Sequence, residues 1–187
     1  MAVRPVEAGS VTAKLFMGLL GSSEEHLDAA KAEVQTRYGP IDLASPVFPF
    51  TFTTYYNKEM GEGIVRQFVS LQVLFDPGRL RAIKKETMIL EGRMSANGKR
   101  RANFDPGYLN LSTVVLATTK DASYRVYLGE GVYAQATLFF RERAFHPFDW
   151  TYPDYREKET LSFFRAVRER LKEQLRETRG ENRGEQK

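Results

Sequence analysis

The residues with the clearest chemical potential lie in one stretch, Lys99 to Leu109, which reads Lys-Arg-Arg-Ala-Asn-Phe-Asp-Pro-Gly-Tyr-Leu. Three cations precede Asp105-Pro106-Gly107, a combination typical of a tight turn. A helix that begins just after Tyr108 would present free backbone N–H groups to this turn, and its dipole together with the cations would favour an anion. The alternative is an exposed basic strand followed by an ordinary turn.

Two further clusters could contribute to such a site. Lys120 and Arg125 could hold an anion through charge-assisted hydrogen bonds. Tyr56 could stack on a ring, and Glu59 could act as an acid or base. The alternative interpretations are an exposed loop with a capping aspartate and a tyrosine that covers the end of the core. The predicted ligand-binding residues are Tyr56, Glu59, Asp105, Gly107, Tyr108, Lys120, Asp121 and Arg125.

Several common chemistries have no motif in this sequence. There is no cysteine, which excludes disulfides, thiolate nucleophiles and cysteine-ligated metals. No phosphate-binding Gly-x-x-x-x-Gly-Lys-Ser/Thr loop occurs. The two histidines, His26 and His146, are far apart and have no metal-ligand spacing. We therefore predict no metal site and identify no cofactor or catalytic residue, and whether the protein is an enzyme stays open.

The periodicity of the apolar residues predicts an α+β fold. Strands are expected at residues 14–20, 50–56, 69–75 and 101–104, and helices at 22–38 and 76–94. This β-α-β-β-α-β order predicts a ferredoxin-like core, in which an antiparallel sheet carries two helices on one face.

The rest of the chain is expected to extend that core. Residues 108–119 suit a short helix capped by Asn110 or Ser112, although their β-branched content also suits a strand. A C-terminal β-hairpin is predicted from residues 124–128 and 132–141, followed by a loop rich in proline and aromatic residues. The last helix is predicted at 157–176, with an apolar stripe along one side.

The length of 187 residues fits one domain. We predict a loose arm at residues 1–11, a single α+β domain at 12–178 and a disordered polar tail at 179–187. The apolar run from Leu15 to Leu20 is far shorter than the roughly 20 residues that a membrane span needs. With no signal-peptide pattern, a cytoplasmic location without membrane attachment is expected. The oligomeric state is not predicted.

The same stretches carry a resemblance to a known family. They are Phe48-Pro49-Phe50, Tyr55-Tyr56, Lys58 to Gly61, Asn103 to Leu109, Thr119 to Asp121, Tyr127 to Gly129 and Trp150 to Tyr155. Together they resemble the DUF4416 family, a prokaryotic family without an established function, over roughly residues 13–156. The resemblance implies a shared binding site around the Asp-Pro-Gly-Tyr motif more than a specific reaction.

These observations favour binding or turnover of an anionic small molecule, for example a nucleotide. An RNA-binding module is an alternative, in which Phe52, Tyr55 and Tyr133 stack on bases while Arg100, Arg101 and the last helix contact phosphates. The net charge of +4 comes mostly from the residues after Tyr155, and a nearly neutral body argues against nucleic acid. A protein–protein interaction module is the third hypothesis.

Overall fold

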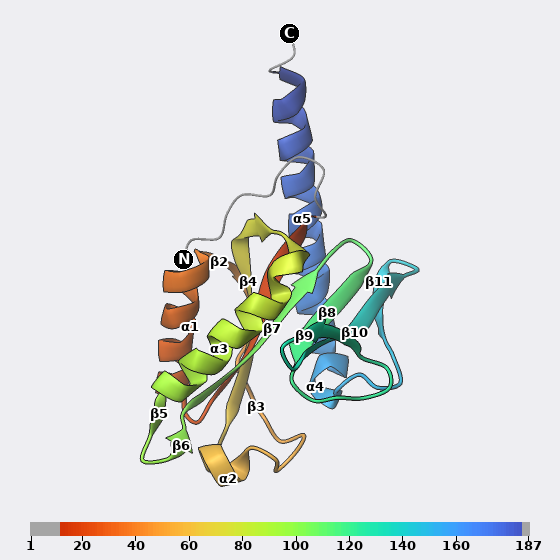
Figure 1. The fold of residues 1–187 in the computed structure, drawn as a ribbon. Helices are drawn as coiled ribbons and strands as arrows, with labels where there is room; N and C mark the ends of the chain where they lie inside the picture. The colour runs from red at the N-terminus through yellow and green to blue at the C-terminus, as the bar shows by residue number, and fades with distance from the viewer. Residues whose placement is uncertain (1–11, 185–187) are drawn as a thin grey trace.

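The computed structural model describes residues 12–184, and Figure 1 shows their arrangement. The predicted arm at residues 1–11 lies outside the described residues. The strands of the large sheet are β1 (Ala13–Gly21), β2 (Ile41–Ala44), β3 (Phe48–Pro49), β4 (Val65–Phe75), β7 (Ala102–Leu109), β8 (Thr113–Thr118), β9 (Val126–Gly129), β10 (Val132–Arg141) and β11 (Ala144–Pro147). The helices are α1 (Glu24–Tyr38), α2 (Asn57–Met60), the short η1 (Pro77–Arg79), α3 (Leu80–Arg93), α4 (Pro153–Arg156) and α5 (Lys158–Gly184). The strands β5 (Ser95–Ala96) and β6 (Lys99–Arg100) form a separate small hairpin.

The sheet is antiparallel throughout, in the order β11-β10-β8-β7-β1-β4-β2. Two short strands add to it, β3 beside β4 and β9 beside β10. The central strand β1 is buried along its whole length because it has neighbours on both edges and cover on both faces. The prediction of an α+β fold with a large antiparallel sheet is confirmed.

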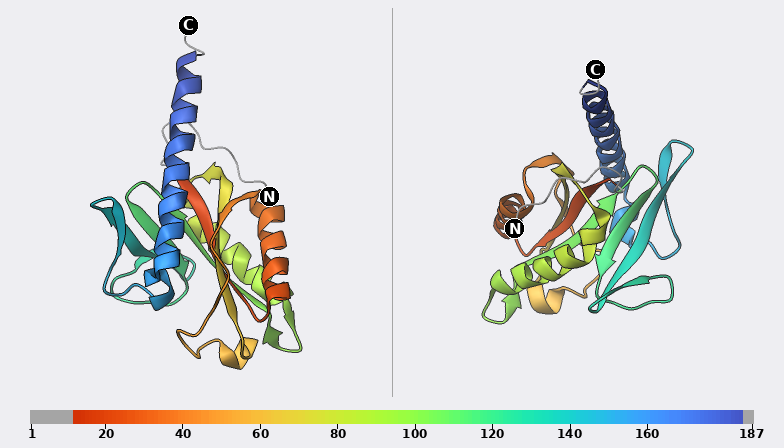
Figure 2. Two further views of the ribbon diagram at one scale, coloured as in Figure 1. Left: turned by 180° about the vertical axis from the view of Figure 1, so that it is seen from behind. Right: turned by 45° about the horizontal axis from the view of Figure 1, so that its top comes forward.

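Opposite faces of the sheet carry different helices, as the two views in Figure 2 show. Helices α1 and α3 cover one face, where Leu15 and Met17 of β1 pack in a core with Val34 and Ile83. Helix α5 covers the other face, where Phe16 lies edge-on to Phe164 with ring centroids 4.9 Å apart. The alternation of side chains along β1 supplies both cores from one strand.

The first helix forms close to its predicted range, and the residues at its two ends explain where it begins and ends. Ser23, which directly precedes the helix, accepts a hydrogen bond from the backbone N–H of His26. The apolar residues of α1 are buried at helical spacing, and Gly39 follows its end with a positive φ of 97°. A serine cap and a left-handed glycine are both common at helix ends.

The predicted strand at residues 50–56 is wrong. Strand β3 ends at Pro49, and the chain then bends into α2. Phe50 and Tyr56 pack against Met60 and Ile64 at the end of β1, so these aromatic residues do not alternate across a pleated strand. Burial of large rings in a local cluster has overridden the strand propensity of the segment.

Of the two interpretations of residues 108–119, the favoured short helix is wrong and the strand is right, because the segment forms the end of β7 and the strand β8. Asn110 caps the turn between them, where its Oδ1 accepts hydrogen bonds from the backbone N–H groups of Ser112 and Thr113, both at 2.8 Å. The β-branched residues Val114 and Val115 then extend between β7 and β10. The asparagine therefore marks a turn between strands, not the start of a helix.

The C-terminal part follows the prediction more closely. Strands β9 and β10 form the expected hairpin, with positive φ at Gly129, Glu130 and Gly131. The loop after β10 contains β11 and α4. Helix α5 continues past the predicted end at Arg176 to Gly184 and projects from the body (Figure 1). Residues 185–187 of the predicted tail lie outside the described residues.

Within residues 12–184, no helix combines the length and the apolar character that crossing a membrane would need.

Candidate functional site

Strands β7 and β8 pair along only part of their length. Their ladder runs from Gly107 to Leu109 on β7 and from Val114 to Leu116 on β8. Residues 102–106 of β7 remain paired to β1 on the other edge but have no partner strand toward β8. The sheet therefore opens between the first half of β7 and the end of β8.

Pro106 stands where the two strands part. Backbone N–H groups of residues two apart point to the same edge of a strand, and the N–H of Phe104 points away from β1 to the side chain of Glu91. The nitrogen of Pro106 faces the same way and has no hydrogen to donate, so the β7–β8 ladder cannot continue through it. Asp105-Pro106-Gly107 is thus the interior of a strand, and the predicted tight turn is wrong.

Side chains from α3 replace the missing strand. Glu91 accepts a hydrogen bond from the N–H of Phe104 at 2.9 Å. Lys84 donates to the carbonyl oxygen of Phe104 at 3.0 Å. These two bonds satisfy backbone groups that would otherwise be buried without partners. Burial raises the pKa of Glu91, against the opposing attraction of Lys84.

A buried arginine lies on the other side of the opening. Arg66 of β4 is 2% exposed and is paired with two carboxylates, Asp105 at 2.9 Å and Asp154 of α4 at 3.0 Å. Its guanidinium reaches Asp105 by crossing over Gly18 of the intervening strand β1. A side-chain carbon at Gly18 would lie only 2.6 Å from Nη2 of Arg66. The glycine therefore leaves the space that this ion pair occupies.

The two carboxylates respond oppositely to this environment. Burial is the largest influence on Asp105, yet the combined attraction of Arg66 and Lys84 outweighs it and lowers the pKa of Asp105. Burial raises the pKa of Asp154 in spite of Arg66. Burial opposes the charge of Arg66, but Asp154, Tyr155 and Asp105 together raise its pKa further. Asp105 is thus held as an ionised acceptor at neutral pH.

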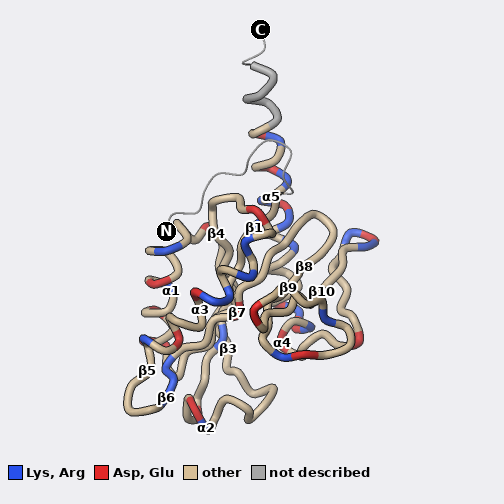
Figure 3. Tube along the Cα trace, in the orientation of Figure 1, with Lys and Arg blue, Asp and Glu red and all other residues tan. Residues whose placement is uncertain are grey.

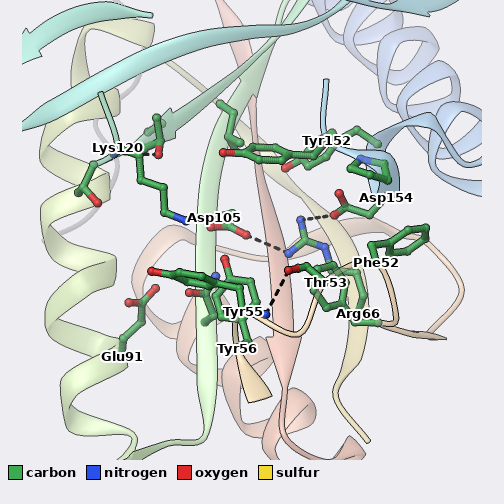
Figure 4. A pocket seen from close by; sticks show the side chains of 18 of the residues that line it. Phe52, Thr53, Tyr55, Tyr56, Arg66, Glu91, Asp105, Lys120, Tyr152 and Asp154 are labelled. Atoms are coloured by element: carbon green, nitrogen blue, oxygen red, sulfur yellow. Dashed lines mark hydrogen bonds and ion pairs between the residues drawn. The ribbon is translucent and has the colours of Figure 1, made fainter. Parts of the chain in front are cut away.

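A pocket of about 490 Å³ occupies the opening, and Figure 4 shows its lining. Its walls come from the segment before α2, from β4, α3, β7 and the end of β8, and from the residues around α4. Aromatic side chains make up much of the surface, namely Phe50, Phe52, Tyr55, Tyr56, Tyr152 and Tyr155. Burial raises the pKa of both Tyr56 and Tyr152, so these hydroxyls stay protonated at neutral pH. The volume is in the range of small-molecule sites, roughly 300–1,000 Å³.

Two cations lie at the pocket edge. The ammonium of Lys120 lies 3.9 Å from the centroid of the Tyr55 ring and, among the described residues, has no carboxylate within 4.0 Å. Arg100 of β6 is paired with Glu91 at 3.0 Å and also with Glu59 of α2. Figure 3 shows basic positions along β6 and an acidic position on the neighbouring α2. Lys120 is therefore the lining cation whose charge is still available to a ligand.

Of the eight residues predicted for the site, the structure brings Tyr56, Asp105 and Lys120 together in the pocket lining. Arg125 lies behind the wall, where it donates to the hydroxyl of Tyr152 at 2.9 Å. Glu59 lies outside the lining and contacts the pocket residue Arg100.

Three predicted residues lie elsewhere. Gly107 is inside β7, where an added side-chain carbon would lie 2.3 Å from the Phe16 ring. Tyr108 points to the opposite face of β7 and packs near Phe75. Asp121 is exposed and is not part of the pocket lining. Their placement follows from the strand that replaces the predicted turn.

Arg66, Lys84 and Glu91 are the functional candidates that sequence reasoning missed. A signal for Arg66 was present, because it shares one face of β4 with Phe68 and Ser70, and a charge on the buried face of a strand needs buried partners. Lys84 and Glu91 gave no such signal, since both are ordinary residues for a helix surface.

The stacking residues of the RNA alternative come from two separate segments of the chain, although Tyr133 is paired with the pocket-lining residue Thr118. Phe52 and Tyr55 line the pocket, whereas Tyr133 belongs to β10 and packs beside Tyr127 at 5.1 Å.

Fold and site together define an α+β protein with an aromatic pocket at a break in an antiparallel sheet and a buried ion-pair cluster in its wall. A family model described as a domain of unknown function, DUF4416, matches residues 11–171. The chain belongs to this family, so the predicted resemblance is confirmed. No curated protein matches the chain. No solved structure matches it either.

Proposed function

We propose that the pocket binds an anionic small molecule with a flat ring, such as a nucleotide. The observation that carries this proposal is Lys120, whose ammonium lies over Tyr55 at the pocket edge without a carboxylate partner among the described residues. An unpaired cation beside aromatic walls suits a ligand that has both an anionic group and a ring.

Polar atoms in the wall support the same proposal. Arg66 Nε, Asn103 Nδ2 and Tyr155 Oη are buried and have no hydrogen-bond partner among the described residues. Unsatisfied buried polar groups are uncommon in proteins and often mark a place where water or a ligand completes the bonding. Three of the seven atoms of this kind in the described part of the chain belong to residues that line the pocket, so the pocket wall is one place where the bonding is incomplete.

The test is a thermal-shift and calorimetric screen with nucleotides and phosphorylated metabolites. We expect at least one compound to bind the parent protein, and to bind the Lys120→Met variant about tenfold or more weakly, the range expected for loss of a charge-assisted hydrogen bond. Lys85→Met is the matched control, because Lys85 is exposed on α3 and does not line the pocket. A broad panel without any binder at millimolar concentration would contradict the proposal.

We also propose that β1 to β7 form a ferredoxin-like unit to which β8–β11 and α5 are added. The strand order β7-β1-β4-β2 with antiparallel neighbours and α1 and α3 on one face supports this assignment. A cytoplasmic location stays a prediction, and fractionation of the native cells would test it.

A further inference from the structure

The charges around the pocket restrict the kind of anion that it can accept. Three carboxylates line it, from Glu91, Asp105 and Asp154. The lining cations Arg66, Arg100 and Lys84 each have at least one of these carboxylates within 4.0 Å. Lys120 alone among the lining cations has none within the described part of the chain. The four cations and three carboxylates of the lining sum to a formal charge of +1, so the single unpaired cation matches a ligand with one anionic group better than a ligand with several.

Asp105 offers the complementary feature. Its Oδ2 accepts the hydrogen bond from Arg66, whereas Oδ1 lies 4.0 Å from the ammonium of Lys84, beyond hydrogen-bonding distance. The side chain is 21% exposed, in contrast to 5% for Asp154. Because the carboxylate is ionised, it can only accept hydrogen bonds, so the group that it receives from a ligand must be a donor.

The space beside these two groups suits an aromatic ring. In Figure 4 the side chain of Lys120 extends along the same wall as Asp105, with Tyr55 and Tyr56 on one side of the carboxylate and Tyr152 on the other. The rings of Tyr55 and Tyr56 are edge-to-face with centroids 5.1 Å apart. A flat ligand between these tyrosines could reach Lys120 with one substituent and Asp105 with another.

Resting on the proposed function, we infer that the ligand is a dipolar aromatic molecule, with one anionic group bound by Lys120 and an amine or N–H donor bound by Oδ1 of Asp105. A polyphosphate is the wrong class for this pocket. The inference adds a hydrogen-bond donor at a defined end of the ligand, whereas the proposed function requires only an anionic group and a ring.

The test uses three small probes at neutral pH, followed by ligand-observed NMR and calorimetry. Tyramine phosphate has a ring, a phosphate and an ammonium donor; phenyl phosphate lacks the donor; and tyramine lacks the anion. We expect the parent protein to bind tyramine phosphate about tenfold or more tightly than either of the other two, since each lacks one charge-assisted hydrogen bond. This comparison needs no variant, so it does not depend on whether a mutated cluster folds.

Two variants then test which protein side chain binds each end of the ligand. With Lys120→Met, the preference for tyramine phosphate over tyramine should disappear. With Asp105→Asn, which keeps the side-chain shape, the preference over phenyl phosphate should fall to about twofold or less, since the amide lacks the negative charge that strengthens the bond. Unaltered preferences in both variants would overturn the assignment.

The outcomes separate this inference from the proposed function. If phenyl phosphate binds the parent as tightly as tyramine phosphate, the dipolar ligand is wrong and the anion-binding pocket stands. If none of the three probes binds while a compound from the broad screen does, the dipolar inference is again wrong. If no probe and no screened compound binds, both proposals fail.

Discussion

The two halves of β7 differ in what supplies hydrogen-bond partners to the edge of the strand that faces β8. From Gly107 to Leu109 the strand has neighbours on both edges, and small or apolar side chains pack closely around it. From Ala102 to Asp105 the neighbour on one edge is missing, and charged side chains from α3 and β4 surround the strand. A strand edge inside a protein needs hydrogen-bond partners, and where a second strand does not supply them, polar side chains must.

The comparison explains why the pocket and the buried charges occur together. Divergence of β7 from β8 creates space, and the same divergence leaves backbone groups that attract Lys84 and Glu91. Lys84 in turn helps to hold Asp105 ionised beside Arg66. The open half is thus a network in which each charge depends on the others, while the closed half depends on steric fit.

The largest change in the free energy of unfolding is expected when the buried arginine is removed. Arg66→Ala should reduce the free energy of unfolding by about 3–5 kcal/mol, because Asp105 and Asp154 would remain buried without their shared partner. Urea denaturation at neutral pH measures this change. Arg93→Ala is the control, since Arg93 is exposed at the end of α3, and it should change stability by less than about 0.5 kcal/mol. Equal effects of the two substitutions would show that the cluster is not coupled to folding.

A second pair of substitutions compares the two halves directly through their glycines. Gly107→Ala should destabilise by about 1–3 kcal/mol through overpacking, because the new carbon would meet the Phe16 ring and, at 2.5 Å, the carbonyl oxygen of Val115. Gly18→Ala would meet mainly the end of the Arg66 side chain, which can move. We therefore expect Gly18→Ala to shift the guanidinium of Arg66 without breaking its ion pairs, and so to cost less stability than Gly107→Ala.

Denaturation curves for both variants give the stabilities, and a crystal structure of Gly18→Ala shows the position of Arg66. A larger cost at Gly18 than at Gly107 would contradict the distinction between an open, adjustable half and a closed, tightly packed one.

The pKa of Asp105 predicts a pH dependence that the closed half lacks. A carboxyl whose pKa is lower in the folded than in the unfolded state stabilises the protein above its unfolded value, which is ordinarily 3.8, and this contribution is lost as pH falls through the folded value. The raised pKa values of Glu91 and Asp154 act in the opposite direction, since the folded state gains protons there first.

The contribution of Asp105 can be isolated with Asp105→Asn. The stability difference between parent and variant should be largest near neutral pH and should shrink as the pH is lowered below about 4, the ordinary range of an aspartate. Urea denaturation at a series of pH values checks this. A difference that stays constant with pH would mean that Asp105 is not preferentially ionised in the folded protein.

The smallest effect is expected where the hydrogen-bond acceptor is kept. Glu91→Gln should cost less than about 1 kcal/mol, because the amide oxygen can still accept from the N–H of Phe104. Glu91→Ala should cost about 1–3 kcal/mol, since that buried N–H would lose its partner. If the alanine and glutamine variants have the same stability, Glu91 does not replace the missing strand in the way that we describe.

Particular residues show how far sequence reasoning reached. The serine before α1, its apolar spacing and Gly39 were sufficient to place that helix, and the glycines around Glu130 were sufficient to place the β9–β10 hairpin. Asn110 was recognised as a capping residue, but an asparagine caps turns and helices alike, and the pairing that made it a turn lies on distant strands.

The candidate site was found only in part for the same reason. Lys120, Tyr56 and Asp105 were predicted from their types, and the fold brings them into one pocket. Gly107 and Tyr108 were predicted from a turn that does not exist. The preference of Asp-Pro-Gly for a turn is weaker than the pairing of β7 with β1 along its whole length.

The sequence by itself determined the α+β class, the main helices, the hairpin and the family, because these depend on periodicity, caps and motifs that are local in the chain. The tertiary structure alone decided that Arg66 bridges Asp105 and Asp154, that Gly18 leaves room for it, and that Lys84 and Glu91 cover an open strand edge. These contacts join residues from separate elements. Their energies depend on burial and distance, which arise only when the strands diverge in the folded protein.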